Sequence, residues 1–212
     1  MKKSFSILLV ACFLATVASA TEQDVVNRSA SIVREFRSMP ERAIPRSVLR
    51  NARGVAILSV VKGGFIFSGK VGDGVVIART RYGWSGPSFI GTGGAGWGLQ
   101  IGGEVTDFVI VLNTQDAVRA FSRGGNITIG GDLSAAAGPI GRTAEGAVMP
   151  KAAIYTYSKS KGLFAGVSLE GAVVATRTEA NRRYYRRPVT ASDILRGRVA
   201  PPSGAAFLRN AL

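Results

Sequence analysis

The chain contains no histidine and a single cysteine, Cys12. Histidine is the usual general base near neutral pH and a common ligand of transition metals, so its absence removes histidine-based catalysis and most zinc sites. Because Cys12 lies in the N-terminal apolar stretch, thiol chemistry is missing from the rest of the chain. No disulfide can form there, and the fold must be held by its core alone.

Acidic residues are also scarce, with 13 Asp and Glu in 212 residues, and they show no D-x-D or E-x-x-E spacing and no calcium loop. Gly91–Gly96 matches the glycine pattern of dinucleotide sites, but strand-like sequence follows it instead of a helix. Ser59 with Lys62, and Ser158 with Lys161, have the S-x-x-K spacing of serine acyl-transfer enzymes, whose companion motifs are absent. The sequence therefore predicts a protein that is not an enzyme, with no cofactor and no metal.

Residues 1–20 have the pattern of a secretory signal peptide. Two lysines precede an apolar run over residues 5–17, and residues 18–20 (ASA) fit a cleavage site. We therefore expect an exported protein, periplasmic or secreted, with a single domain over residues 21–212 and no transmembrane segment in the mature chain. In an alternative interpretation, residues 9–12 form a lipobox and Cys12 becomes a lipidated N-terminus.

Positive charge is in large excess, because 27 Lys and Arg face 13 Asp and Glu, for a net charge of +14. Removal of the signal peptide takes away two lysines and leaves +12. This excess favours an anionic partner, and arginine suits bidentate contacts to phosphate, although a basic surface can serve solubility alone. Since export argues against nucleic acid, we expect an anionic membrane lipid. The alternative is an envelope module that binds a protein or an acidic glycan.

The stretch 53–104 alternates short runs rich in Val, Ile and Phe with glycine. This pattern predicts strands over residues 55–61, 65–71 and 75–81, joined by tight turns at Lys62–Gly64 and Gly72–Gly74. A fourth strand starts at Ser88 and is so rich in glycine that it must bend, or let a backbone or ligand approach closely.

Residues 22–38 predict an amphipathic helix that ends before Pro40, and a short helix follows Pro45, with Gly54 at its end. The first helix either packs on a sheet or lies on a bilayer with its arginines toward lipid phosphates. Packing on a sheet is the favoured interpretation, because the apolar stripe is moderate and a sheet of this kind needs a cover.

Further elements are expected after the glycine-rich strand. Residues 105–112 form the most apolar strand, Asn113 caps a helix of about ten residues, and residues 130–150 form a bent strand and loop. Segments 152–158 and 163–175 form a hairpin, and residues 179–187 and 192–196 are helical. Pro201-Pro202 ends the ordered domain, whose core covers about 45–197. The fold class is α+β, a curved, mostly antiparallel and barrel-like β-sheet with flanking N-terminal, inserted and C-terminal helices.

The segment NRRYYRRP at 181–188 is the strongest functional signal. If it is helical, its arginines form two pairs spaced one turn apart, which could hold lipid phosphates with the tyrosines at headgroup depth. A solvated charged helix is the alternative. Trp84, in a segment rich in Gly and Pro, is a candidate exposed anchor. The candidate lipid-binding residues are Arg28, Arg34, Arg37, Lys62, Lys70, Trp84, Lys159, Lys161, Arg182, Arg183, Tyr184, Tyr185, Arg186 and Arg187.

Several stretches resemble the SYLF domain family: GVAILSVVKGGFIFSGKVGDGVVIAR, WSGPSFI, ITIGGDLSAAAGPIGR, IYTYSKSKGLFAGVSLEG and NRRYY. The resemblance covers roughly residues 45 to 197, which is more specific than any short motif. It implies a lipid-binding domain. Eukaryotic members are tied to phosphoinositide membranes and to actin at endocytic sites, and bacterial members are mostly exported. A phosphoinositide-like headgroup is therefore expected from the resemblance alone.

Overall fold

The structure is a computed structural model that describes residues 20–39, 43–64, 67–97, 102–138, 152–162 and 171–212. Residues 1–19, which include Cys12, lie outside the described residues, as do residues 139–151 and 163–170 of the predicted loop and hairpin. In chain order the elements are α2 (Glu22–Ser38), α3 (Arg46–Asn51), β1 (Gly54–Gly64), β2 (Phe67–Thr80), β3 (Gly83–Trp84), β4 (Ser88–Trp97), β5 (Gly102–Leu112), α4 (Gln115–Ser122), β6 (Asn126–Thr128), β7 (Ala135–Ala137), β8 (Ile154–Gly162), β9 (Val173–Thr176), α5 (Thr178–Tyr185), α6 (Ala191–Leu195), η2 (Ser203–Ala205) and α7 (Ala206–Arg209).

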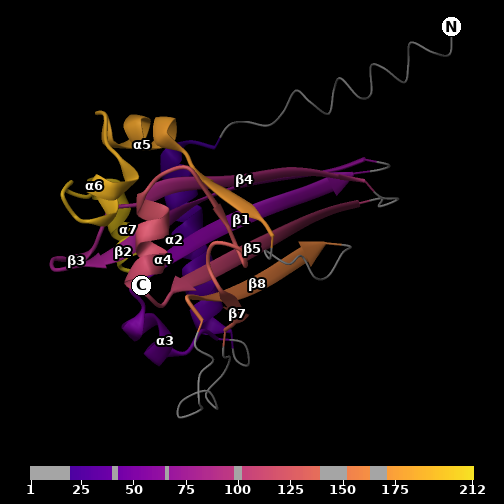
Figure 1. Ribbon diagram of the computed structural model, residues 1–212, viewed down its shortest axis with the longest axis horizontal. Helices are drawn as coiled ribbons and strands as arrows, with labels where there is room; N and C mark the ends of the chain where they lie inside the picture. The colour runs from indigo at the N-terminus through magenta and orange to yellow at the C-terminus, as the bar shows by residue number, and fades with distance from the viewer. Residues whose placement is uncertain (1–19, 40–42, 65–66, 98–101, 139–151, 163–170) are drawn as a thin grey trace, which may run out of the picture.

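The strands form one nine-stranded sheet in the order β6-β9-β4-β2-β1-β5-β8-β7, with β3 paired to β2. All pairs are antiparallel except β7 with β8. The sheet curls strongly into a half-barrel flanked by helices (Figure 1). The predicted α+β fold with a curved, mostly antiparallel sheet is confirmed. The apolar strand predicted at 105–112 corresponds to β5, which lies between β1 and β8 in the interior of the sheet.

Each face of the sheet has its own apolar cluster, because successive side chains of a strand point to opposite faces. Val55 and Ile57 belong to the face covered by α2, α3 and α7. Ala56 and Leu58 belong to the opposite face, which α4 and α6 cover. The two clusters therefore share the central strand β1, whose residues 55–58 are completely buried.

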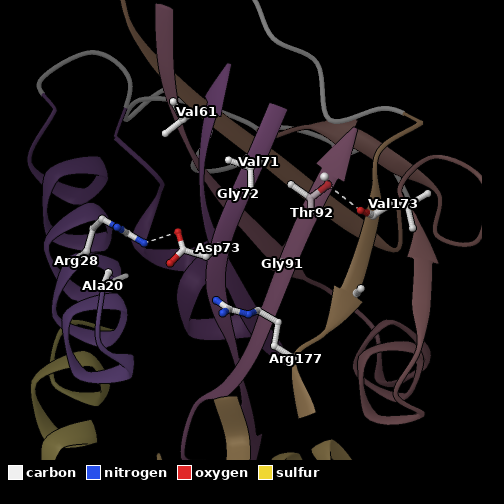
Figure 2. Close-up of a pocket in the computed structure, with 12 residues that line it drawn as sticks. Ala20, Arg28, Val61, Val71, Gly72, Asp73, Gly91, Thr92, Val173 and Arg177 are labelled. Atoms are coloured by element: carbon white, nitrogen blue, oxygen red, sulfur yellow. Dashed lines mark hydrogen bonds and ion pairs between the residues drawn. The ribbon is translucent and has the colours of Figure 1, made fainter. Parts of the chain in front are cut away.

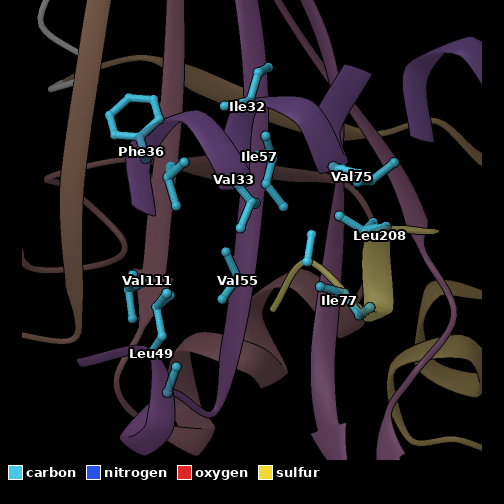
Figure 3. Packing of buried hydrophobic residues seen from close by; sticks show 14 of the residues in the cluster. Ile32, Val33, Phe36, Leu49, Val55, Ile57, Val75, Ile77, Val111 and Leu208 are labelled. Atoms are coloured by element: carbon cyan, nitrogen blue, oxygen red, sulfur yellow. The ribbon is translucent and has the colours of Figure 1, made fainter. Parts of the chain in front are cut away.

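Thr21 caps the start of α2, because its hydroxyl accepts a hydrogen bond from the N–H of Asp24 while the Asp24 carboxylate accepts one from the Thr21 N–H. Val26, Val33 and Phe36 are at most 2% exposed, and Figure 3 shows Val33 and Phe36 pointing toward the strands. Each such side chain contributes roughly 1.5–3 kcal/mol when fully buried. The favoured interpretation of α2 as a helix packed on the sheet is confirmed, so its apolar stripe is not available to a bilayer.

The predicted turn at Gly72–Gly74 is wrong, because β2 runs unbroken from Phe67 to Thr80 between β1 and β4. A Cβ at Gly74 would lie 1.9 Å from the carbonyl oxygen of Ile57, and one at Gly72 would lie 2.8 Å from Val60 Cγ2. These glycines therefore serve the close approach of β1 and β2 rather than a turn.

Four other expectations are also corrected. β8 pairs with β5 and β7 while β9 pairs with β4 and β6, so the two segments do not form a hairpin and SKSKG lies within β8. Thr114 caps α4 instead of Asn113, because its hydroxyl accepts from the N–H of Ala117. Gly54 starts β1 rather than ending α3. The ordered fold continues past Pro202 into η2 and α7, where Leu208 is fully buried.

Replacement of Gly74 by Ala tests the close approach of the two strands. We expect Gly74→Ala to lower the free energy of unfolding by about 3 kcal/mol or more, because its Cβ would overlap the backbone of Ile57. Gly69→Ala is the matched control, since a Cβ on this residue of the same strand meets nothing within 4 Å. Urea unfolding measures both variants, and equal stability of the two would contradict the assignment of Gly74.

Candidate functional site

A polar row crosses the sheet next to the apolar residues that α2 covers. Two ion pairs join α2 to it: Arg28 to Asp73 at 2.5 Å, and Glu35 to Lys159. Because the two pairs lie seven residues apart on α2 and end on β2 and β8, they fix the direction of the helix across the sheet. The row, in register across four strands, consists of Ser59, Asp73, Asp107 and Lys159.

The next row on the same face is apolar yet exposed. Val61 is paired in register with Val71 on β2 and with Val105 on β5. Their exposed fractions are 50%, 66% and 39%. Scattered single valines on a surface need no explanation, but three neighbours in register form a small apolar patch that is typical of a contact surface. We call these three residues the valine row.

A groove of about 720 Å³ lies between the start of α2 and the strands β2, β4 and β9 (Figure 2). Val61, Val71 and Val173 supply apolar lining, while Arg28 and Arg177 supply positive charge. Arg177 is exposed and follows β9 directly. Its Cδ would lie 3.1 Å from a Cβ at position 91, so the absence of a side chain at Gly91 leaves room for it.

A second groove, of about 650 Å³, lies on the other side of the first turn of α2 and is bordered by α5 and η2. Arg183, Arg186 and Arg187 line it. Arg183 donates to the Glu22 carboxylate at 2.8 Å. Among the described residues, Arg186 and Arg187 have no ion-pair or hydrogen-bonding side-chain partner, and both are exposed.

Arg186 has an unusual backbone conformation. It ends α5 with φ 54 and ψ 26, in the left-handed region where helices normally place glycine. No other residue except glycine has a positive φ in the part of the chain that the structure describes. Such a conformation costs an ordinary residue about 1–2 kcal/mol, and residues held this way cluster at functional sites.

The first turn of α2 separates the two grooves, since Ala20 lines the first and Glu22 lines the second. Partial desolvation raises the pKa of Glu22, but the hydrogen bond from Arg183 and the charges of Arg183 and Arg177 hold it below its ordinary value. We call the basic residues around this turn the arginine surface. It consists of Arg28, Arg177, Arg183, Arg186 and Arg187.

The predicted arrangement of the 181–188 segment is partly wrong. The helix ends at Tyr185, so residues 186 and 187 do not lie one turn after 182 and 183. Arg182 forms an ion pair with Glu179 on the same helix. The tyrosines are structural: Tyr185 is 9% exposed and donates to the carbonyl of Pro87, and Tyr184 packs edge-on against Phe89. Burial raises the pKa of Tyr184 to about 12.

Trp84 is not an exposed anchor. It is 7% exposed, in the cluster beneath α2, and the Arg79 guanidinium covers its ring at 4.0 Å. Arg34 and Arg37 lie on α2, where the first stacks on Phe207 and the second donates to the carbonyl of Ala211.

The predicted lysines do not join the arginine surface. Lys62 and Lys70 face each other in register on β1 and β2, on the sheet face opposite to the valine row. Lys159 pairs with Glu35 of α2. Lys161 of β8 is paired in register with Val105 of β5.

Sequence reasoning missed Arg177 and the valine row. Arg177 carries no local signal, because only the pairing of β4 with β9 brings it beside Gly91. The valine row was detectable in principle: Val61, Ile57 and Val55 alternate on one face of β1. The misread turn at 72–74 concealed its extension to Val71.

Within the described ranges, no helix is both long enough and apolar enough to cross a bilayer. The same residues contain no group of three or more acidic, cysteine or histidine side chains placed to hold a metal ion. Both S-x-x-K matches lie on strands, β1 and β8, where positions three apart point to opposite faces.

The fold and this surface define a basic, groove-bearing α+β domain. Residues 93–212, more than half of the chain, match the family described as "Ysc84: Las17-binding protein actin regulator". The chain therefore belongs to the Ysc84 family, which contains the SYLF domain, and the predicted resemblance is confirmed.

Curated relatives agree with this assignment. The chain is 53% identical to LAS seventeen-binding protein 3 of Saccharomyces cerevisiae over 76% of the chain and 36% of the relative. It is 49% identical to human SH3 domain-containing YSC84-like protein 1 over 84% of the chain and 54% of the relative. It is 50% identical to Protein YSC84 of S. cerevisiae over 80% and 37%. The chain thus spans about a third to a half of these relatives, and none of the three names is that of an enzyme.

Replacement of Tyr185 tests whether this side chain is structural. We expect Tyr185→Phe to lower the free energy of unfolding by about 1–2 kcal/mol, because the buried carbonyl of Pro87 loses its donor. Tyr82→Phe is the control, since Tyr82 is 70% exposed and should not change stability. Thermal and urea unfolding give the comparison. An unchanged midpoint for Tyr185→Phe would mean that this hydroxyl is not needed for the fold, and Tyr185 would again be a candidate ligand-binding residue.

Proposed function

We propose that this domain binds anionic phospholipid at the membrane surface through the arginine surface, with the valine row reaching the headgroup region. The single observation that carries the proposal is a groove that brings the exposed Val61 and Val71 together with the unpaired Arg177 at the start of α2. The neighbouring groove adds the unpaired Arg186 and Arg187. Apolar side chains that enter the interface, combined with cations that meet lipid phosphate, are the two components of peripheral binding.

The electrostatic contribution to the binding free energy can be estimated from the arginines that have no ion-pair partner. Arg177, Arg186 and Arg187 have no ion-pair partner among the described residues, whereas Arg28 and Arg183 are engaged with Asp73 and Glu22. Each basic residue near an anionic surface contributes about 1 kcal/mol. The three free arginines then contribute about 3 kcal/mol, or roughly a hundredfold in affinity at low salt.

The headgroup is a further part of the proposal. Family resemblance favours phosphoinositide-like groups, and paired phosphates suit guanidinium forks.

The export of the chain, its signal peptide and the lipobox alternative at Cys12 stay predictions. The residues on which these predictions depend, 1–19, lie outside the described residues.

Vesicle co-sedimentation tests this function. We expect the purified protein to bind phosphatidylcholine vesicles only when they contain phosphatidylserine or a phosphoinositide. The triple variant Arg177→Gln, Arg186→Gln, Arg187→Gln should bind about 100-fold more weakly at low salt. Added salt should weaken the wild type more than the variant, because exposed charges are screened.

A charge-matched variant is the control. Arg119→Gln, Arg123→Gln, Arg182→Gln removes the same charge from outside both grooves and should bind nearly as well as wild type. Glu22→Gln should bind more tightly, because it frees Arg183 and removes a negative charge from the surface. Equal weakening of both triple variants, or binding that ignores lipid charge, would refute the proposal.

A protein partner is the second candidate, and the family description favours it, since it names Las17 binding and actin regulation. The names of two relatives refer to Las17 binding or to SH3 domains. Those relatives are longer than the matched region, so their partners come to this chain as a hypothesis. Co-sedimentation of this domain with actin filaments, in the absence of lipid, separates the two candidates.

A further inference from the structure

A second basic surface lies at the hairpin of β2 and β3, and the proposed lipid function does not use it. Arg79 pairs in register with Trp84 across the hairpin, and its guanidinium lies 4.0 Å from the ring centroid. At the turn, the Arg81 guanidinium lies 4.7 Å from the ring of Tyr82, which is 70% exposed. Two of the arginines are therefore stacked on aromatic rings at one end of the sheet.

Two other elements extend this surface. Arg209 of α7 donates from Nε to the Trp84 carbonyl at 2.9 Å, which leaves its terminal nitrogens free. A Cβ at Gly197 would lie 3.0 Å from Thr80 Cγ2, so the end of α6 abuts the hairpin and brings the exposed Arg196 with it. We call this the hairpin surface, and it consists of Arg79, Arg81, Tyr82, Trp84, Arg196 and Arg209.

The charge of this surface is not compensated locally. Among the described residues, Arg79, Arg81, Arg196 and Arg209 form no ion pair. Three ion pairs among the described residues join side chains within five residues of each other, but the hairpin sequence RTRYGW contains no acid. Uncompensated arginines held by stacking and hydrogen bonds form a preorganised anion-binding surface.

The stacking decides which anion fits. The Trp84 ring is buried and one of its faces is covered by Arg79, so it can neither receive a nucleic-acid base nor enter a bilayer. Tyr82 is the one exposed ring of the hairpin surface, and the Arg81 guanidinium lies over it. The outward groups that remain are guanidinium edges, whose paired N–H donors match carboxylates. We propose that the hairpin surface binds an acidic segment of a protein partner.

The hairpin surface lies well away from the valine row. Val71 and Arg79 are eight residues apart on the unbroken strand β2, so about 26 Å separates the valine row from the hairpin surface. A domain whose valine row contacts a membrane would therefore still present the hairpin surface to a second molecule. This inference is independent of the lipid proposal, because it uses none of the arginines around the first turn of α2.

Fluorescence anisotropy with a labelled polyglutamate peptide tests the inference on the full chain. We expect the double variant Arg81→Gln, Arg196→Gln to bind the peptide about tenfold more weakly than wild type. Both side chains are exposed, so the fold should survive, and thermal unfolding checks it. Arg186→Gln, Arg187→Gln removes the same charge from the arginine surface and should bind the peptide nearly as well as wild type.

Two outcomes would overturn the assignment. One is equal weakening by the two double variants, which would mean that the peptide responds to net charge alone. The other is displacement of the peptide by single-stranded oligothymidylate at concentrations as low as those of unlabelled polyglutamate, which would indicate a nucleic-acid surface. Vesicle binding is measured in parallel, and the Arg81→Gln, Arg196→Gln variant should bind vesicles as wild type does. The result of the peptide assay therefore does not depend on whether the arginine surface binds lipid.

Discussion

The packing of α2 across the central strands is the interaction on which the rest of the structure depends. Val26, Val33 and Phe36 are buried against the sheet, and Arg28 and Glu35 tie the helix to β2 and β8. Because α2 stops covering the sheet at the polar row, the valine row beyond it stays exposed. The first turn of α2 also forms the wall between the two grooves. The docked helix thus positions a surface, and it does not itself supply an apolar stripe to a bilayer.

Glycine sets the second constraint. At Gly72 and Gly74 a side chain would collide with β1, so the close contact of two long, curled strands depends on these residues. The same strand carries Asp73 and Val71 to the groove at one end and Arg79 to the hairpin surface at the other. Arg186 shows the opposite choice, since an arginine occupies a left-handed position where glycine would be easier. Glycine thus avoids a steric clash in the sheet, whereas Arg186 holds a strained backbone conformation beside the second groove.

Features encoded by local pattern could be predicted from the sequence, and features that need distant pairing could not. The bounds of α2 follow from its helical period and from Pro40 after its end, and β5 follows from an apolar run. A glycine pair signals either a turn or a close strand contact, so Gly72–Gly74 was ambiguous until β1 and β4 were in place. The arginines near 182 were visible, but the partner of Arg183 is Glu22, 161 residues earlier, and no local rule supplies that pair.

The central claim is that α2 stays docked while the arginine surface meets lipid. Hydrogen–deuterium exchange of the α2 amides, with and without anionic vesicles, tests it most directly, because docked helices exchange through large openings and free ones through fraying. We predict that the amides of residues 26–33 remain as protected as those of β1 when the protein is bound to vesicles. Loss of that protection on binding would mean that the helix leaves the sheet, and would contradict the account.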